Sequence, residues 1–139
     1  MDYLSKTTIG FDIAETSLTS KSSKLKSKKS FLVFRHNKYT IVPTDNIAFF
    51  YFKFASSNIV CFDQEEYSVS YSLDQIQQLV PEEQFFRLNR QYLANFNAVK
   101  EAEHYFARKL LVKLTIPVSE KLIVSKEKGK RFLNWLENR

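Results

Sequence analysis

The chain has 139 residues, of which 44% are hydrophobic and 15% aromatic, and its formal net charge at pH 7 is +6. This length suits one domain with an ordinary core and excludes two domains of ordinary size, while the apolar content argues against a wholly disordered chain. The positive charge favours a polyanionic partner without naming it, because many soluble proteins are mildly basic.

Residues 1–30 differ in composition from the rest of the chain. From residue 16 to residue 30 the sequence consists mainly of Ser, Thr and Lys. Such a segment buries too little apolar surface to offset the entropy lost on ordering, so we predict a flexible basic linker or arm. A basic arm would contact phosphates without sequence preference, and a linker that is simply solvated is the alternative.

Residues 31–139 predict one mainly β domain. Short apolar or alternating stretches are separated by polar turns, which is typical of antiparallel strands. The expected strands cover residues 31–34, 39–42, 47–54, 59–62, 67–70, 86–89, 99–105, 110–115 and 121–124. The stretch 47–54 is almost wholly apolar, so we expect a strand buried on much of both faces, followed by a turn at 55–58.

Two helices are expected, one in mid-chain and one at the C-terminal end. Ser72 is a favourable N-cap for a helix over residues 73–80, and Pro81 follows its end. Ser125 is a favourable N-cap for a second helix that extends to about Glu137.

Cys61 is the single cysteine, and it lies in the apolar stretch 59–62. We expect a small buried side chain rather than a nucleophile, and one cysteine excludes an internal disulfide, which suits a reducing compartment. The N-terminus has no apolar signal region, and no apolar run approaches the length that crosses a membrane. We therefore expect a cytoplasmic protein that does not bind membranes.

The segment 85–99, FFRLNRQYLANFNAV, is the strongest candidate for a functional site. Asn89, Arg90 and Gln91 form a polar cluster between apolar residues. Arg, Asn and Gln are the side chains that hydrogen-bond two atoms of a base edge at once, so this cluster predicts contacts with DNA bases. The alternative is that Arg90 is an ordinary solvated residue at the end of a strand.

The same segment resembles the hallmark of the LytTR DNA-binding domain, found in the LytR/AlgR family of bacterial response regulators. The likeness rests on the bulky pair Phe85-Phe86, on Arg87 and Arg90 with their spacing, and on an apolar run that ends in Asn95. An early hairpin, a buried strand and a short helix precede this segment in the family's order, and an apolar–Ser–basic step at residues 124–126 follows it. The resemblance covers residues 31–136.

This resemblance implies an elongated arrangement of small antiparallel β-sheets with little helix. It also implies that loops, rather than a recognition helix, enter successive major grooves of promoter DNA. Most family members are the output half of two-component response regulators and bind repeated sites as dimers. The implied partners are therefore double-stranded DNA, a second copy of the chain on repeated sites, and a receiver domain upstream in a longer protein. Some family members stand alone, so a stand-alone protein without a receiver domain is the alternative.

Carried over residue by residue, the resemblance assigns base contacts to Arg90, to Lys126 and to the turn after the buried strand. In that turn Ser57 is the nearest match and Asn58 is its neighbour. Lys126 replaces the Arg that is common in the family, and a lysine lacks the planar fork that hydrogen-bonds a base at two points. Asn89 and Gln91 flank Arg90 as further candidates, whereas Asn95 is expected to hold a turn through local backbone bonds.

Phosphate contacts are expected from basic residues near these positions, because such contacts supply most of the affinity for DNA. The candidates are Lys53, Arg87, Arg108, Lys109, Lys128, Lys130 and Arg131.

Enzymatic chemistry has little support in the sequence. His36 and His104 lack metal-ligand spacing with Cys61, and a P-loop cannot form with glycine only at Gly10 and Gly129. We therefore expect no catalytic activity, metal or cofactor. The alternative to a DNA-binding regulator is a basic β-rich module that binds an acidic protein or a membrane surface.

Overall fold

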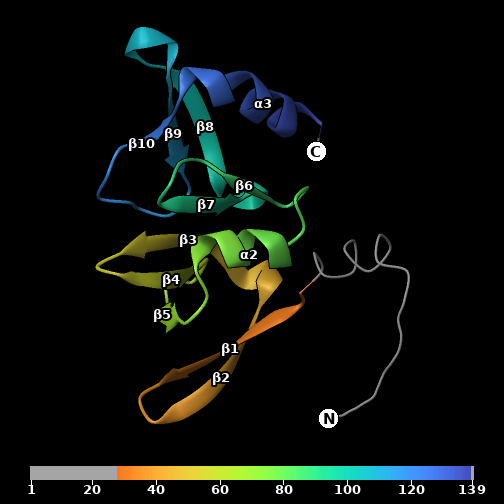
Figure 1. Ribbon diagram of the computed structural model, residues 1–139, viewed down its shortest axis with the longest axis vertical. Helices are drawn as coiled ribbons and strands as arrows, with labels where there is room; N and C mark the ends of the chain where they lie inside the picture. The colour runs from red at the N-terminus through yellow and green to blue at the C-terminus, as the bar shows by residue number, and fades with distance from the viewer. Residues whose placement is uncertain (1–27, 139) are drawn as a thin grey trace.

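The computed structural model describes residues 28–138 (Figure 1). The linker or arm expected over residues 1–30 therefore lies outside the described residues, except for its last three. The backbone N–H of Lys28 donates to the carbonyl oxygen of Leu79 at 2.9 Å, and the carbonyl oxygen of Lys29 accepts from Thr44 at 2.9 Å. Ser30 already belongs to the first strand.

Three small antiparallel β-sheets make up the body of the domain, which confirms the predicted fold class. The first is a hairpin of β1 (Ser30–Arg35) and β2 (Lys38–Pro43). The second has five strands in the order β5-β4-β3-β7-β6, and the third has three in the order β10-β9-β8. Their bounds are β3 (Ile47–Lys53), β4 (Ser56–Cys61), β5 (Glu66–Val69), β6 (Phe85–Arg87), β7 (Tyr92–Asn95), β8 (Val99–His104), β9 (Leu110–Leu114) and β10 (Leu122–Val124).

The sheets are arranged along one axis, which gives the domain an elongated shape (Figure 1). The β1–β2 hairpin lies at one end, and the three-stranded sheet with helix α3 (Lys126–Glu137) lies at the other. Helix α2 (Leu73–Leu79) lies beside the central sheet. Short 3-10 turns, η1 (Thr44–Asn46), η2 (Phe96–Ala98) and η3 (Phe106–Arg108), precede β3, β8 and β9.

Strand β3 separates two hydrophobic cores. Its side chains alternate in direction, so Phe50 packs into a core with Phe31 and Ile76, while Phe49 packs into the other core with Phe132. Burial on both faces explains why the sequence of β3 is almost wholly apolar, as predicted.

The turn after β3 lies earlier in the chain than predicted. Phe54 and Ala55 form it with φ angles of 54° and 59°, and β4 begins at Ser56. A two-residue hairpin turn with positive φ at both positions matches the twist of the flanking strands, although it usually contains Asn or Gly. Because neither residue type is present, the sequence did not signal this turn, and the prediction of a turn at 55–58 was wrong.

Both predicted helices are confirmed, together with their caps. The hydroxyl of Ser72 accepts from the N–H of Gln75 at 3.1 Å, and the Gln75 side chain accepts from the N–H of Ser72 at 2.8 Å. The hydroxyl of Ser125 accepts from the N–H of Lys128 at 3.3 Å. These bonds satisfy N–H groups that have no partner within a helix, so each cap sets the start of its helix.

Helix α3 is fixed against β6. The ring of Phe86 lies 5.2 Å from both the Phe132 and Trp135 rings, measured between centroids. The indole N–H of Trp135 donates to the carbonyl oxygen of Glu82 at 3.0 Å. These contacts fix the position of α3 relative to β6 and to the segment before it.

Candidate nucleic-acid interface

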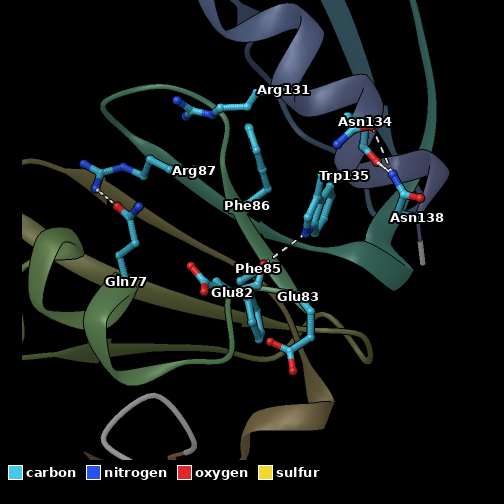
Figure 2. Close-up of a pocket in the computed structure, with 10 residues that line it drawn as sticks. All are labelled: Gln77, Glu82, Glu83, Phe85, Phe86, Arg87, Arg131, Asn134, Trp135 and Asn138. Carbon is cyan, nitrogen blue, oxygen red and sulfur yellow. Dashed lines mark hydrogen bonds between the residues drawn. The ribbon is translucent and has the colours of Figure 1, made fainter. Parts of the chain in front are cut away.

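Arg87 holds the loop between β6 and β7, which contains the predicted base-contacting cluster. Its Nε donates to the carbonyl oxygen of Asn89 at 2.9 Å, and its Nη2 donates to that of Arg90 at 2.8 Å. Its Nη1 lies 2.9 Å from a carboxylate oxygen of Asp74 and 2.9 Å from the side-chain oxygen of Gln77, both on α2. Figure 2 shows the contact with Gln77. Only 16% of the Arg87 side chain is exposed, so its fork connects the loop to α2 rather than reaching solvent.

Asn89 shapes the same loop from within. Its side-chain oxygen accepts from the backbone N–H groups of Gln91 at 2.8 Å and Tyr92 at 3.0 Å. Its amide nitrogen donates to the carbonyl oxygen of Ile123 in β10 at 3.5 Å. The sequence predicted that Asn89 contacts bases, but these bonds use its side-chain oxygen twice and one of its two N–H donors, which gives it a structural role.

Arg90 and Gln91 are the exposed side chains of this loop. Within residues 28–138 neither side chain has a hydrogen bond or an ion pair. The loop backbone is held, since the carbonyl oxygen of Gln91 also accepts from the N–H of Phe52 at 2.9 Å. The loop therefore presents two long polar side chains from a fixed backbone, which favours specific contacts over a diffuse charge.

The start of α3 lies next to this loop. The ammonium group of Lys128 donates to the carbonyl oxygen of Arg87 at 3.1 Å. Partial burial, together with the nearby positive charges of Arg87 and Arg131, lowers the pKa of Lys128. Lys128 is thus committed to the backbone, whereas the sequence assigned it to phosphate.

Lys126 and Lys130 are the exposed lysines of the first α3 turns, and among the described residues their side chains have no hydrogen bond or ion pair. Residues four apart lie on one face of a helix, so the two side chains point to the same side. The guanidinium carbon of Arg131 lies 5.8 Å from the centre of the Phe86 ring, and both side chains are drawn in Figure 2.

The turn between β3 and β4 presents Phe54 rather than Ser57. Phe54 is 90% exposed at the tip of the turn. Lys53, a predicted phosphate contact, has its ammonium group 5.6 Å from the centre of the Phe54 ring and 2.9 Å from a carboxylate oxygen of Glu120. The hydrogen bond from Lys53 is the main cause of the lowered pKa of Glu120.

Phe54 was missed by reasoning from sequence because it was assigned to the buried strand. The only signal was Lys53, a charged residue that interrupts the apolar run just before it.

Ser57 and Asn58 lie inside β4, which corrects their predicted place in a turn. Ser57 is 3% exposed, so its hydroxyl cannot reach a base while β4 stays in the sheet. The amide of Asn58 donates to the carbonyl oxygen of Ser56 at 3.1 Å and accepts from the Ser68 hydroxyl at 3.1 Å.

Arg108 and Lys109 lie apart from the other candidates. They follow Phe106 in the turn between β8 and β9, at the top of the view in Figure 1. The β3–β4, β6–β7 and β9–β10 connections instead follow one another along a single side of the molecule (Figure 1). The structure therefore divides the predicted phosphate contacts between two locations.

No group of three or more His, Cys, Asp and Glu residues in the described part of the chain is placed to hold a metal ion. No helix between residues 28 and 138 is long and apolar enough to cross a membrane.

Comparisons with known proteins agree with the family resemblance. Residues 37–137 match the family described as the LytTr DNA-binding domain. Among solved structures, the fold is similar to one described as the LytTr DNA-binding domain of a methyl-accepting/DNA response regulator from Bacillus cereus. The TM-score is 0.68 at 19% sequence identity, and the match covers 79% of this chain and 98% of that chain. No curated protein matches the chain.

Proposed function

The chain belongs to the family of LytTR DNA-binding domains, and from this premise we propose that it is the sequence-specific DNA-binding domain of a bacterial transcription regulator. The observation that carries the proposal is the loop between β6 and β7. Arg87 and Asn89 hold its backbone, while Arg90 and Gln91 remain exposed and without partners among the described residues.

Arg90 is the residue proposed to specify a base. An arginine fork donates two parallel hydrogen bonds to the O6 and N7 atoms of guanine, which is the commonest specific contact in the major groove. Gln91 beside it has the donor and the acceptor that match adenine. Because the loop backbone is already ordered, binding need not fix it, which favours affinity at the correct sequence.

Connections on one side of the domain are proposed to enter successive major grooves. The β6–β7 loop supplies Arg90, the start of α3 supplies Lys126 and Lys130, and the β3–β4 turn supplies Phe54. An exposed aromatic ring suits apolar contact with a thymine methyl group or a sugar. The positive end of the helix dipole disfavours lysines at the start of a helix. A nearby DNA phosphate would offset this effect through its negative charge.

Three further proposals rest on the family resemblance. Two copies of the chain bind repeated promoter sites, a receiver domain belongs to the same regulator in a longer protein, and the protein acts in the cytoplasm. None of the proposed roles requires catalysis or a cofactor.

A binding-site selection with wild-type chain and Arg90→Ala tests the base contact. We expect Arg90→Ala to lose preference at one position of the selected motif, with a cost of roughly 1–3 kcal/mol there. Lys130→Ala is the matched control, because it also removes one exposed positive charge. It should weaken binding to all sequences about equally and reduce the salt slope by about 0.9.

Recovery of the wild-type motif at unchanged strength with Arg90→Ala would show that Arg90 does not specify a base. Competition with random genomic DNA and heparin tests the function itself. A wild-type chain that binds heparin and every duplex equally well would support the alternative, a basic module for acidic surfaces.

A further inference from the structure

The β1–β2 hairpin has one buried and one exposed apolar face. Its inner face packs into the core through Phe31, Val33 and Val42. Its outer face exposes Leu32 (65%), Phe34 (55%), Tyr39 (73%) and Ile41 (67%). We refer to these four residues as the hairpin patch.

The hairpin patch is a compact two-by-two array. In the strand register Leu32 is opposite Ile41 and Phe34 is opposite Tyr39. The Phe34 and Tyr39 rings lie 4.8 Å apart between centroids. Large apolar side chains in directly opposed pairs form one continuous surface, unlike scattered exposed residues, which need no explanation.

The packing of residues 28–138 does not account for this surface. The outer face of an antiparallel hairpin that faces water usually carries polar residues. Here the two remaining outer-face residues, Ser30 and Pro43, are also uncharged. Arg35 and Lys38 occupy the opposite face, and Arg35 forms an ion pair with Glu65 at 2.6 Å. A charged partner would therefore find no group on the patch with which to form an ion pair. Two identical uncharged patches, in contrast, meet without electrostatic repulsion.

The size of the patch matches a weak interface between two copies. With 55–73% of each residue exposed, the patch presents on the order of 500 Å² of surface. Two patches packed face to face would bury about 1,000 Å² in total, at the low end for specific protein contacts. Such an interface forms a dimer that dissociates readily.

The location of the patch leaves the candidate DNA interface free. The hairpin lies at the end of the elongated domain opposite α3 (Figure 1), whereas the Arg90 loop adjoins the start of α3. A contact between identical patches produces a twofold symmetric pair that closes on itself. In that pair the two DNA-contacting regions remain uncovered.

We propose that the hairpin patch, formed by Leu32, Phe34, Tyr39 and Ile41, is the surface through which two copies of this chain associate. This inference deepens the proposed function by assigning the dimer contact, and it rests on that function only for its effect on DNA. On a duplex with two sites, a bound copy raises the local concentration of its neighbour, so a weak contact suffices for cooperative binding.

Sedimentation of the full chain without DNA tests the contact directly. The wild-type chain should dimerise with a dissociation constant of about 0.1 mM, as expected for a small interface. Leu32→Glu should weaken dimerisation at least tenfold. Phe106→Glu is the matched control, because Phe106 is 66% exposed outside the patch, and it should dimerise like wild type.

Thiol cross-linking provides a second measurement that does not depend on tolerance of a charge. Ile41→Cys and Phe106→Cys introduce thiols at similar exposure, 67% and 66%, while the natural Cys61 is buried. A short bis-maleimide should link Ile41→Cys into dimers and leave Phe106→Cys monomeric. If wild-type chain stays monomeric at millimolar concentration and both thiol variants cross-link equally little, the proposal is wrong.

Two further outcomes identify what fails. If neutral phosphatidylcholine vesicles bind wild-type chain but not Leu32→Glu, and no dimer forms, the patch is a membrane contact and the proposal is overturned. On a duplex with two selected sites, Leu32→Glu should lose cooperativity and keep the single-site affinity of Phe106→Glu. If the wild-type chain dimerises, but wild type, Leu32→Glu and Phe106→Glu all fail to bind DNA, the DNA-binding function is refuted and the dimer contact stands.

Discussion

Replacing Arg87 with methionine tests whether this residue positions the β6–β7 loop or contacts DNA directly. Arg87→Met keeps much of the apolar stem and removes every hydrogen bond of the guanidinium. The lost bonds include those to the carbonyl oxygens of Asn89 and Arg90, at 2.9 and 2.8 Å. The contacts with Asp74 and Gln77 on α2 are lost as well.

The loss in free energy of unfolding depends on how exposed each hydrogen-bond partner of Arg87 is. Hydrogen bonds from a charged donor to a backbone oxygen are worth about 1.5–3 kcal/mol each, and the lower figure applies because one of these bonds is exposed and the other is only partly buried. The carboxylate of Asp74 is 89% exposed, so that pair adds little. We therefore expect Arg87→Met to lower the free energy of unfolding by about 3 kcal/mol, or roughly 10 °C in melting temperature.

Arg87→Met should weaken binding to the selected site without weakening binding to random DNA. If binding must order one or two loop residues again, at on the order of 1–2 kcal/mol per residue, binding to the selected site becomes about 10- to 100-fold weaker. Affinity for random DNA and the salt slope should stay unchanged, since no phosphate contact is removed. Thermal unfolding and salt titrations of a binding assay measure both quantities.

Arg108→Met is the control, because it removes the same charge from an exposed residue that has no hydrogen bond or ion pair within the described chain. It should unfold like wild type. The positioning role of Arg87 is refuted if Arg87→Met unfolds within about 2 °C of wild type and lowers the salt slope by about 0.9, which is the signature of a phosphate contact.

Other positions give equally direct expectations. Asn95→Ala should cost about 2–4 kcal/mol in urea unfolding, because its buried amide donates to Ile47 at 2.8 Å and accepts from Asn97 at 2.9 Å; a cost below about 1 kcal/mol contradicts this. Ser57→Ala should leave the selected motif unchanged. It should also stabilise the fold by up to about 1 kcal/mol, because the buried hydroxyl has no partner among the described residues. Lost preference at one base would instead support the prediction that Ser57 contacts DNA. Burial is the main cause that raises the pKa of Cys61 to about 11. Alkylation of the folded chain at about pH 7.5 should therefore be at least ~100-fold slower than alkylation of the unfolded chain, and it should accelerate as the pH rises towards 11. Equal rates would show that the thiol is accessible in the folded chain.

Local patterns predicted most of the secondary structure. Alternation over two residues marked the strands, and Ser72 and Ser125 marked the helix starts, because caps and strand periodicity depend on residues only a few positions apart. The structural role of Asn95 was predicted for the same reason. Its bond to the N–H of Asn97 spans two residues, although its bond to Ile47 spans 48.

The sequence predictions were wrong where the position of one turn decides which residues of a strand are buried. The early turn at Phe54 and Ala55 places Ser57 inside β4 and buries it, whereas Phe54 is exposed at the tip. A shift of one residue moves every side chain of a strand to the other face, so a misplaced turn reverses which residues reach a ligand.

The sequence by itself determined the class of fold, the family and the segment that carries Arg90, because these depend on composition and on motifs along the chain. Only the tertiary structure decided which charged residues remain available. Lys53 pairs with Glu120, Lys128 with the backbone of Arg87, and Arg87 with α2. These partners lie ten or more residues away in the chain, so sequence spacing cannot predict them. The same holds for the hairpin patch, since only the packed domain shows which face of the hairpin residues 28–138 leave exposed.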